Sequence, residues 1–162
     1  MEKLATRRGY ERLEARYSDL SKDLSKKQKS LGEMASQGNV WHDNSPFEDL
    51  RDETNRLSMQ VSEAADDLRG IRIVEYPRVL PNNAICYGSG IDLLLDGQAE
   101  RFSLVGYGDS NPELGRLLYV SPLGKVLIGH KAGDKFKEHV NDLLVSFEIK
   151  RVFVLNDPDL IL

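Results

Sequence analysis

The sequence predicts an α+β protein, with an N-terminal antiparallel coiled-coil hairpin followed by a small, mostly antiparallel β-sheet domain. Two segments that repeat apolar residues at alternating spacings of three and four predict the hairpin. A change of pattern after Ile71 predicts the sheet, because short runs of Val, Ile, Leu, Phe and Tyr then alternate with Gly-, Asp- and Asn-containing turns. We therefore expect a coiled-coil domain over residues 1–75 and a β domain over residues 76–162.

The first segment has eight repeat positions, and only Lys27 interrupts its apolar seam: Tyr10, Leu13, Tyr17, Leu20, Leu24, Lys27, Leu31 and Met34. The second segment repeats the same spacings at Phe47, Leu50, Thr54, Leu57, Val61, Ala64, Leu68 and Ile71. A period of 3.5 residues is typical of a coiled coil. Thr6 is the expected N-cap of the first helix, and Asn44 or Ser45, followed by Pro46, is expected to start the second.

A short connection between two seams of equal length predicts an antiparallel hairpin with its tip at residues 38–48. Arms of roughly 25–30 residues make a rod on the order of 40 Å long. The tip sequence, GNVWHDNSPFE, holds the chain's one Trp and one of its three His residues. A narrow two-helix rod of this length is poorly explained by stability alone, so we interpret it as a probe.

In the β domain, the Leu94-Leu95-Asp96-Gly97 sequence predicts a hairpin turn between two strands. The run SPLGKVLIG predicts one short helix, with Ser121 as its cap and Pro122 at its first position.

The composition is that of a soluble protein with a net charge of -4 and a mean hydropathy of -0.43. The sequence shows neither a run of 18 apolar residues nor a secretory signal, and its single Cys86 fits a reducing compartment, so we expect a cytoplasmic protein. The net negative charge argues against bulk binding to nucleic acid, and we expect weak or no direct DNA binding. Charge is unevenly distributed, at +3 over residues 1–36 and -5 over residues 37–70, which suggests two elements that pack on each other.

Catalytic motifs are missing from the sequence. There is no P-loop, the GSG of residues 88–90 lacks the rest of a dinucleotide motif, and three scattered His with one Cys give no zinc spacing. No Ser lies in a nucleophile elbow. These catalytic readings are therefore set aside.

The tip offers the chemistry of a metal ligand. Asp43 lies between His42 and Asn44, with Glu48 and Asp49 one turn away, and such oxygen ligands suit Mg²⁺. A second ion placed beside a metal already in a phosphoryl-transfer site would activate water against a phosphodiester. The alternative is structural: Trp41 and Phe47 pack over the open end of the coiled coil, and residues 43–45 cap the second helix.

The sequence resembles the bacterial Gre transcript-cleavage factors, GreA and GreB, along nearly its whole length. TRRGYERLEARYSDL is similar to the opening helix of that family, and FSLVGYGDSNPELGRLLYVSPLGKVLIGHKAGDKF is similar to its C-terminal stretch, with Gly, Ser-Pro and Gly-Asp in register. The resemblance implies an immunophilin-like fold for the β domain. It also implies that this domain binds RNA polymerase at the rim of the secondary channel, through Ser121, Pro122, Leu123 and Gly124.

By the same resemblance, the coiled coil enters the channel and its tip reaches the polymerase active site and the 3′ end of the nascent RNA. The tip would hold a Mg²⁺ shared with the polymerase, which the free protein does not bind tightly, and the polymerase would cut backtracked RNA. By position, Asp43 and Asn44 match the family's Glu-Asn and Phe47 its Tyr, whereas Trp41 and His42 are foreign to the family's tip. We expect four residues to support the loop: Trp41, His42, Phe47 and Glu48. Asn39 stands where the family has its first acid, and one extra residue separates it from Asp43.

This divergent tip leaves two hypotheses open. The protein either stimulates RNA cleavage with a modified tip, or it occupies the channel and regulates the polymerase without cleavage. A third hypothesis, from another class, is a peptidyl-prolyl isomerase or chaperone built on the β domain. We favour cleavage.

Overall fold

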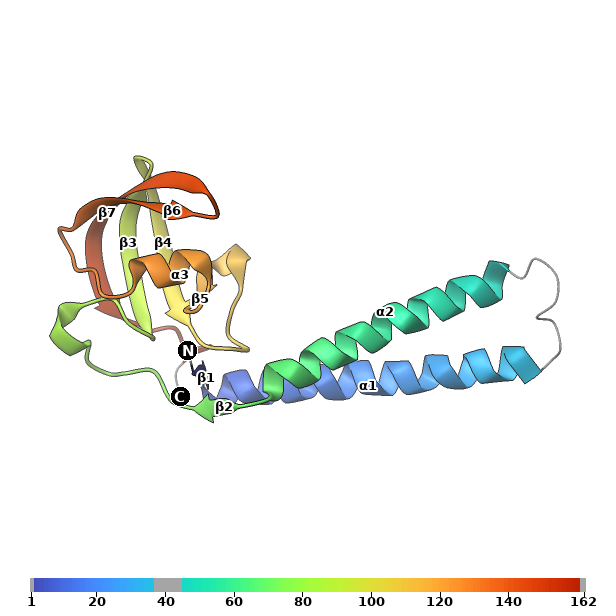
Figure 1. Cartoon of the computed structure of the whole chain (residues 1–162). Helices are drawn as coiled ribbons and strands as arrows, with labels where there is room; N and C mark the ends of the chain where they lie inside the picture. The colour runs from blue at the N-terminus through green and yellow to red at the C-terminus, as the bar shows by residue number, and fades with distance from the viewer. Residues whose placement is uncertain (1, 37–44, 161–162) are drawn as a thin grey trace. The chain divides into compact units, whose positions relative to one another are not determined.

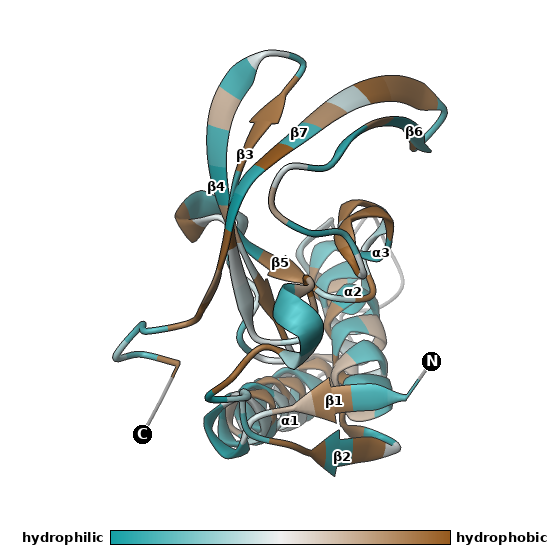
Figure 2. Cartoon of the chain, turned by 90° about the vertical axis from the view of Figure 1, so that its left-hand side faces the viewer, coloured by the Kyte–Doolittle hydropathy of each residue, from teal (hydrophilic) through white to brown (hydrophobic). Residues whose placement is uncertain are grey.

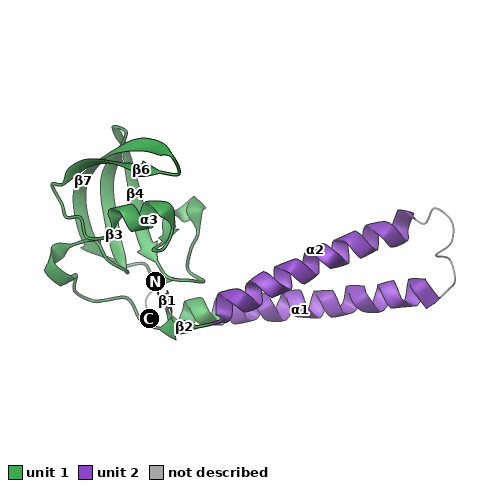
Figure 3. Ribbon diagram, in the orientation of Figure 1, with its two compact units in different colours: residues 1–11, 70–162 green, residues 12–69 purple. Residues whose placement is uncertain are grey.

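The structure of the chain is a computed structural model that describes residues 2–36 and 45–160 (Figure 1). It divides into two compact units, shown in green and purple in Figure 3. Unit 1 combines residues 1–11 with residues 70–162, and unit 2 is formed by residues 12–69. Each unit is described by itself below.

Unit 2 is the predicted helical hairpin, made of most of helix α1 (Arg7–Ser36) and helix α2 (Ser45–Leu68). The predicted seams match the observed burial: within both helices every seam position except Tyr17 is half-buried or buried. Tyr17 is 38% exposed. On α2 the seam includes the two buried residues of the helix, Thr54 and Ala64. The apolar period read from the sequence is therefore the face that the helices bury.

Both seams carry a polar residue at the third position from the connecting loop, Lys27 on α1 and Thr54 on α2. The Lys27 ammonium forms an ion pair with Glu53 across the hairpin at 2.8 Å. The hydroxyl of Thr54, which is 6% exposed, donates to the Leu50 carbonyl at 2.6 Å. These three residues form a polar layer in an otherwise apolar seam, a feature that fixes the register of coiled coils.

Unit 1 is built on a five-stranded sheet in the order β5-β4-β3-β7-β6. All neighbours are antiparallel except β4 and β5, so the sheet is mostly antiparallel, as predicted. Between β3 and β4, Asp96 and Gly97 adopt positive φ, which confirms the turn predicted at residues 94–97. The strands are β3 (Ser89–Leu95), β4 (Gln98–Val105), β5 (Arg116–Leu118), β6 (Lys135–Val140) and β7 (Leu143–Val154).

The core of unit 1 lies on one side of this sheet. Alternate residues of β3, Ile91 and Leu93, are at most 1% exposed and pack with Leu127 of helix α3 (Pro122–Leu127). A second buried cluster joins Tyr76 and Val105 to the C-terminal residues Leu155 and Leu160. Figure 2 colours these elements by hydropathy, with hydrophilic stretches on β4 and β6 and hydrophobic residues on α3.

The domain boundary differs from the one predicted at residues 75 and 76, because the first residues of the chain belong to unit 1. Strand β1 (Lys3–Ala5) pairs in parallel with β2 (Ile71–Ile73), and Ala5 is fully buried. The Leu4 N–H donates to the Tyr119 hydroxyl, and the Leu4 carbonyl accepts from the Tyr107 N–H, each at 2.9 Å. The β domain is therefore discontinuous in sequence. The predicted α+β class, a helical hairpin with a mostly antiparallel sheet, is confirmed.

None of the helices that the structure describes is both long enough and apolar enough to cross a membrane.

Candidate functional site

The tip of the hairpin is the site that the sequence predicts, and most of it lies outside the described residues. Asn39, Trp41, His42, Asp43 and Asn44 fall between the end of α1 at Ser36 and the start of α2 at Ser45. Their predicted roles as metal ligands and supports of the loop stay predictions.

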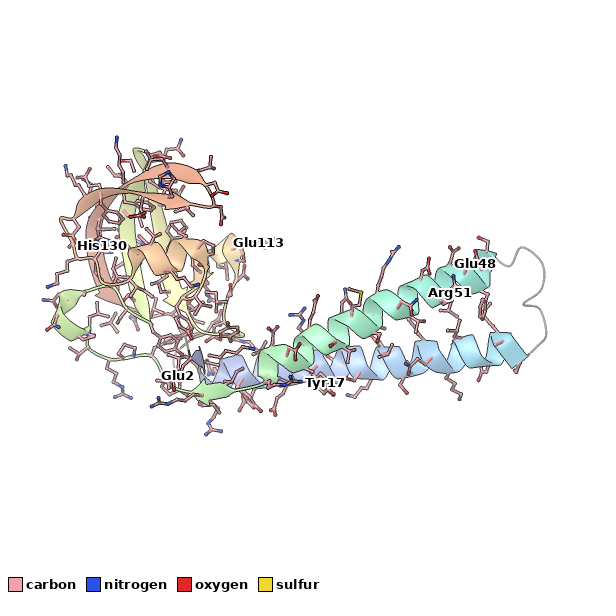
Figure 4. All side chains as sticks on the ribbon, in the orientation of Figure 1. Glu2, Tyr17, Glu48, Arg51, Glu113 and His130 are labelled. Carbon is pink, nitrogen blue, oxygen red and sulfur yellow. The ribbon has the colours of Figure 1, made fainter. Side chains whose placement is uncertain are left out.

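Two tip residues with a predicted role in the site, Phe47 and Glu48, are described, on the first turns of α2. Phe47 is half-buried at the first position of the α2 seam. Its role in closing the end of the coiled coil stays a prediction. Glu48 is exposed, and Figure 4 shows it projecting from the start of α2, with Arg51 one turn further on. A carboxylate in the first turn is favoured by the helix dipole, so the N-terminal end of α2 presents negative charge beside the tip.

Within the described residues no group of three His, Cys, Asp or Glu side chains could hold a metal ion. Glu48 and the neighbouring Asp49 are the exposed carboxylates next to the tip. Two carboxylates are enough to bind Mg²⁺ when waters and a partner supply the other ligands. Glu48 and Asp49 are adjacent on α2 and do not share one side of the helix. A shared Mg²⁺ at the tip therefore stays a prediction, and its predicted ligand Asp43 lies outside the described part of the chain.

The predicted polymerase-binding residues form the first turn of helix α3, where each has a different environment. Ser121 is the N-cap, as predicted, and its hydroxyl accepts from the Gly124 N–H at 3.1 Å. Pro122 follows at the start of the helix and is exposed. Leu123 is half-buried against the core. Of these three, Pro122 is the most available to a partner.

Gly124 is buried for a steric reason. A Cβ atom there would lie 2.8 Å from each of the carbonyl oxygens of Leu118 and Tyr119. Only glycine allows α3 to approach the preceding chain so closely. The turn therefore combines two residues that shape it, Ser121 and Gly124, with an exposed Pro122 that a partner can touch.

A buried polar cluster, which the sequence did not predict, fixes the first turn of α1 within unit 1. The Asp109 carboxylate is 2% exposed and accepts from the Thr6 hydroxyl at 2.8 Å and from the Tyr76 hydroxyl at 2.7 Å. Thr6 is the predicted N-cap, and its Oγ1 accepts from the Gly9 N–H at 2.9 Å. The Tyr76 oxygen in turn accepts from the Gly106 N–H at 3.0 Å. We call Thr6, Tyr76 and Asp109 the Asp109 cluster.

The tyrosines around this cluster have perturbed acidity. Burial raises the pKa of Tyr76 far above its usual value, and its hydrogen bond to Asp109 raises it further. Burial also raises the pKa of Tyr87, which packs on Tyr76 with ring centroids 4.9 Å apart. Both phenols are therefore neutral structural donors.

The sequence showed only half of this cluster. The N-cap role of Thr6 could be predicted from its place before a helix, because a cap is a local feature. Its contact with Asp109 spans 103 positions and depends on the tertiary fold.

Residues 80–153 match the family model described as "Transcription elongation factor, GreA/GreB, C-term". This range contains α3 and the five-stranded sheet except for Val154, the last residue of β7. Relatives named transcription elongation factor GreA align along most of the chain. The protein of Nitratiruptor sp. is 25% identical over 150 residues, which are 91% of both chains. That of Chlorobium phaeovibrioides is 26% identical over 153 residues, covering 92% of this chain and 95% of its own.

Solved structures give weaker matches. Gfh1, the GreA factor homolog 1 of Thermus thermophilus, is 24% identical with a TM-score of 0.46 and covers 94% of this chain and 99% of its own. A GreA/GreB factor from Nitrosomonas europaea is 18% identical with a TM-score of 0.38 and covers 65% of this chain and 91% of its own. Residues 80–153 are thus similar to the C-terminal domain of GreA/GreB elongation factors, and relatives named GreA are similar to this chain along most of its length.

Proposed function

We propose that this protein binds RNA polymerase through its β domain, inserts its helical hairpin into the secondary channel and stimulates Mg²⁺-dependent cleavage of backtracked RNA. One observation carries the proposal: a GreA/GreB-type C-terminal domain shares the chain with a hairpin whose acidic α2 terminus adjoins the tip. Relatives named as GreA elongation factors support it. The protein then acts as an accessory factor in the cytoplasm, and the reacting centre belongs to the polymerase.

The chain's own contribution is to bring a carboxylate to that centre. Asp43 is the proposed ligand of the shared Mg²⁺, and the side-chain amide oxygens of Asn39 and Asn44 are the neighbouring ligands. Glu48 adds negative charge at the start of α2. When bound, the ion would activate water for attack on the phosphodiester. The half-buried Phe47 ties the adjoining turn of α2 to the seam.

A second function, occupancy of the channel without cleavage, is favoured by one feature of the sequence. Asn39 replaces the acid that the family resemblance leads us to expect, and an amide oxygen is an uncharged and weaker Mg²⁺ ligand than a carboxylate. In this case the protein would slow nucleotide addition and leave backtracked RNA intact.

Binding to polymerase is tested at Pro122, because this exposed residue can be changed without removing the cap or the close contact of α3. Pro122→Asp keeps a residue that helix N-termini accept, and we expect it to weaken binding to core polymerase by at least about tenfold. The matched control is Pro112→Asp, since Pro112 is also exposed and also begins a short helix, η2 (Pro112–Leu114). Equal affinities of the two variants in a direct binding titration would contradict a contact at α3.

A further inference from the structure

The face of the sheet that points away from the core of unit 1 carries rows of charged side chains. Because Ile91 and Leu93 point into the core, the alternate β3 residues Asp92 and Leu94 point to the opposite face. Asp92 is in register with Arg101 of β4 and Arg151 of β7, so these three side chains form one row across three strands. We call this side of the sheet the outer sheet face.

The first row is a cluster of two cations on one carboxylate. Asp92 accepts from Arg101 at 2.6 and 3.1 Å and from Arg151 at 3.0 Å, and the two arginines hold the pKa of its carboxyl below its usual value. Both guanidinium groups also lie over the ring of Phe153, at 5.7 and 4.7 Å from its centroid. The arginine side chains stay 68% and 60% exposed, so this row presents a pre-organised pair of cations to the solvent.

A second cluster repeats this pattern on the neighbouring strands. Glu148 of β7 pairs with Lys135 at 3.2 Å and with Lys150 at 2.5 Å. Lys135 is directly opposite Glu148 in the ladder, and Lys137 lies two residues further along β6, on the same face. Here too one carboxylate holds two cations and leaves an excess of positive charge.

Two shallow hollows lie along this face, and cations line both. One has a volume of about 380 Å³ and is lined by Asp92, Leu94, Ala99, Glu100, Arg101 and Lys150, with Leu93 beneath. The other has a volume of about 250 Å³ over β6 and β7, where Lys135, Lys137, Ser146 and Glu148 line it with Phe136 and Phe147. Their floors include small or apolar residues, and their rims are basic. The outer sheet face is thus hollowed where its cations gather.

We propose that the outer sheet face binds single-stranded nucleic acid through its phosphates, without reading its sequence. Five cations and three carboxylates, Glu100 included, line this face, so it is locally positive on a chain whose net charge is -4. Neighbouring strands about 4.8 Å apart and alternate residues about 6.7 Å apart set out these cations at spacings that a flexible phosphodiester chain can follow. The proposal does not rest on binding to polymerase.

An acidic protein is the competing occupant, and two observations argue against it. Three of the five cations are lysines, Lys135, Lys137 and Lys150, and lysine is depleted in protein–protein interfaces. The Phe153 ring on this face is covered by the two arginines and by Gly90, where a Cβ would lie 2.2 Å from the ring. It is therefore not free to act as a central apolar anchor, nor as a platform for a base. What the face offers is charge, which suits phosphates.

The test is binding of fluorescently labelled oligo(dT) to the full chain, followed by anisotropy over a series of salt concentrations. We expect affinity to fall with salt, since each neutralised phosphate contributes about -0.7 to the slope of log K against log salt. The double variant Lys135→Gln/Lys137→Gln should bind on the order of tenfold more weakly at low salt. Its slope of log K against log salt should be less steep by roughly 1.4. The control, Lys26→Gln/Lys29→Gln, removes the same charge from exposed positions of α1 in unit 2 and should bind as the parent does.

Every other outcome overturns the proposal. Salt-independent binding or none shows that the face does not take phosphates. An equal loss of affinity in both double variants shows that binding is not specific to the outer sheet face, and a loss of affinity in the α1 variant alone moves the site to the hairpin. Competition by poly-glutamate as effective as that by unlabelled oligo(dT), per charge, assigns the face to an acidic protein.

Discussion

Asp109 is the acceptor for two buried hydroxyl groups, those of Thr6 and Tyr76. Asp109→Ala leaves both without this acceptor, and each unmet buried donor costs about 1–3 kcal/mol. We therefore expect the free energy of unfolding to fall by about 3 kcal/mol, measured by urea denaturation. Ser110→Ala, at the exposed neighbouring position, is the control and should change stability by less than about 0.5 kcal/mol. A loss below about 1 kcal/mol in Asp109→Ala would show that the cluster is not stabilising.

The raised pKa of Tyr76 makes the free energy of unfolding depend on pH. Burial raises its pKa in the folded state far above the value of about 10 that it has when unfolded. Below pH 10 the Tyr76 phenol is protonated in both the folded and the unfolded state, and its full contribution to the free energy of unfolding is present. Above pH 10 the unfolded state loses this proton first, so stability falls by up to about 1.4 kcal/mol per pH unit. Tyr76→Phe should show a shallower fall between pH 10 and pH 11 in chemical denaturation, and an unchanged slope would contradict the assignment.

The polar layer of the hairpin consists of Lys27, Glu53 and Thr54. We expect it to fix the register of the two helices and to make the hairpin less stable than an apolar layer would. Its ion pair is partly exposed, with side chains 31% and 59% accessible, so it contributes at most about 1 kcal/mol. An apolar pair at these positions should therefore stabilise the hairpin. We expect Lys27→Leu/Thr54→Leu to raise the free energy of unfolding by about 1–2 kcal/mol in thermal or chemical denaturation. Lower stability in this variant would show that the layer contributes more than register.

Strand β1 is expected to be necessary for the β domain, because its residues complete the fold of unit 1. Removing residues 1–6 deletes the β1–β2 pairing, the buried Ala5 and the Thr6 cap. We expect such a chain to lose near-UV circular dichroism from the tyrosines of the β domain and to unfold at markedly lower urea concentration. A truncated chain as stable as the parent would contradict the discontinuous domain. For the same reason a fragment of residues 75–162 is not a test of isomerase activity.

Local patterns account for what the sequence predicted correctly. The seams follow from a 3.5-residue period, the cap at Ser121 from a Ser-Pro pair, and the β3–β4 turn from Asp96-Gly97. What it missed depends on residues far apart, such as Asp92 with Arg151 and Thr6 with Asp109. Of the predicted tip at residues 38–48, the structure describes only residues 45–48, so the sequence remains the source for the rest.

At the scale of the whole molecule, one continuous helix, α1, begins in unit 1 and runs through unit 2. Its first turn is held by the Asp109 cluster inside the unit whose residues 80–153 match the GreA/GreB C-terminal model. In the proposed function the two units have separate roles. The β domain would bind the polymerase, and the hairpin would carry Asp43 to its active site.

The most direct test of this account is RNA cleavage in a backtracked polymerase elongation complex at fixed Mg²⁺ concentration. It compares no factor, the parent protein and Asp43→Ala, with polymerase binding measured for both proteins. The account predicts that the parent accelerates cleavage and that Asp43→Ala loses at least about tenfold of that acceleration while binding persists. If neither protein accelerates cleavage although both bind and slow nucleotide addition, the cleavage function is contradicted and the hairpin is an occupant of the channel.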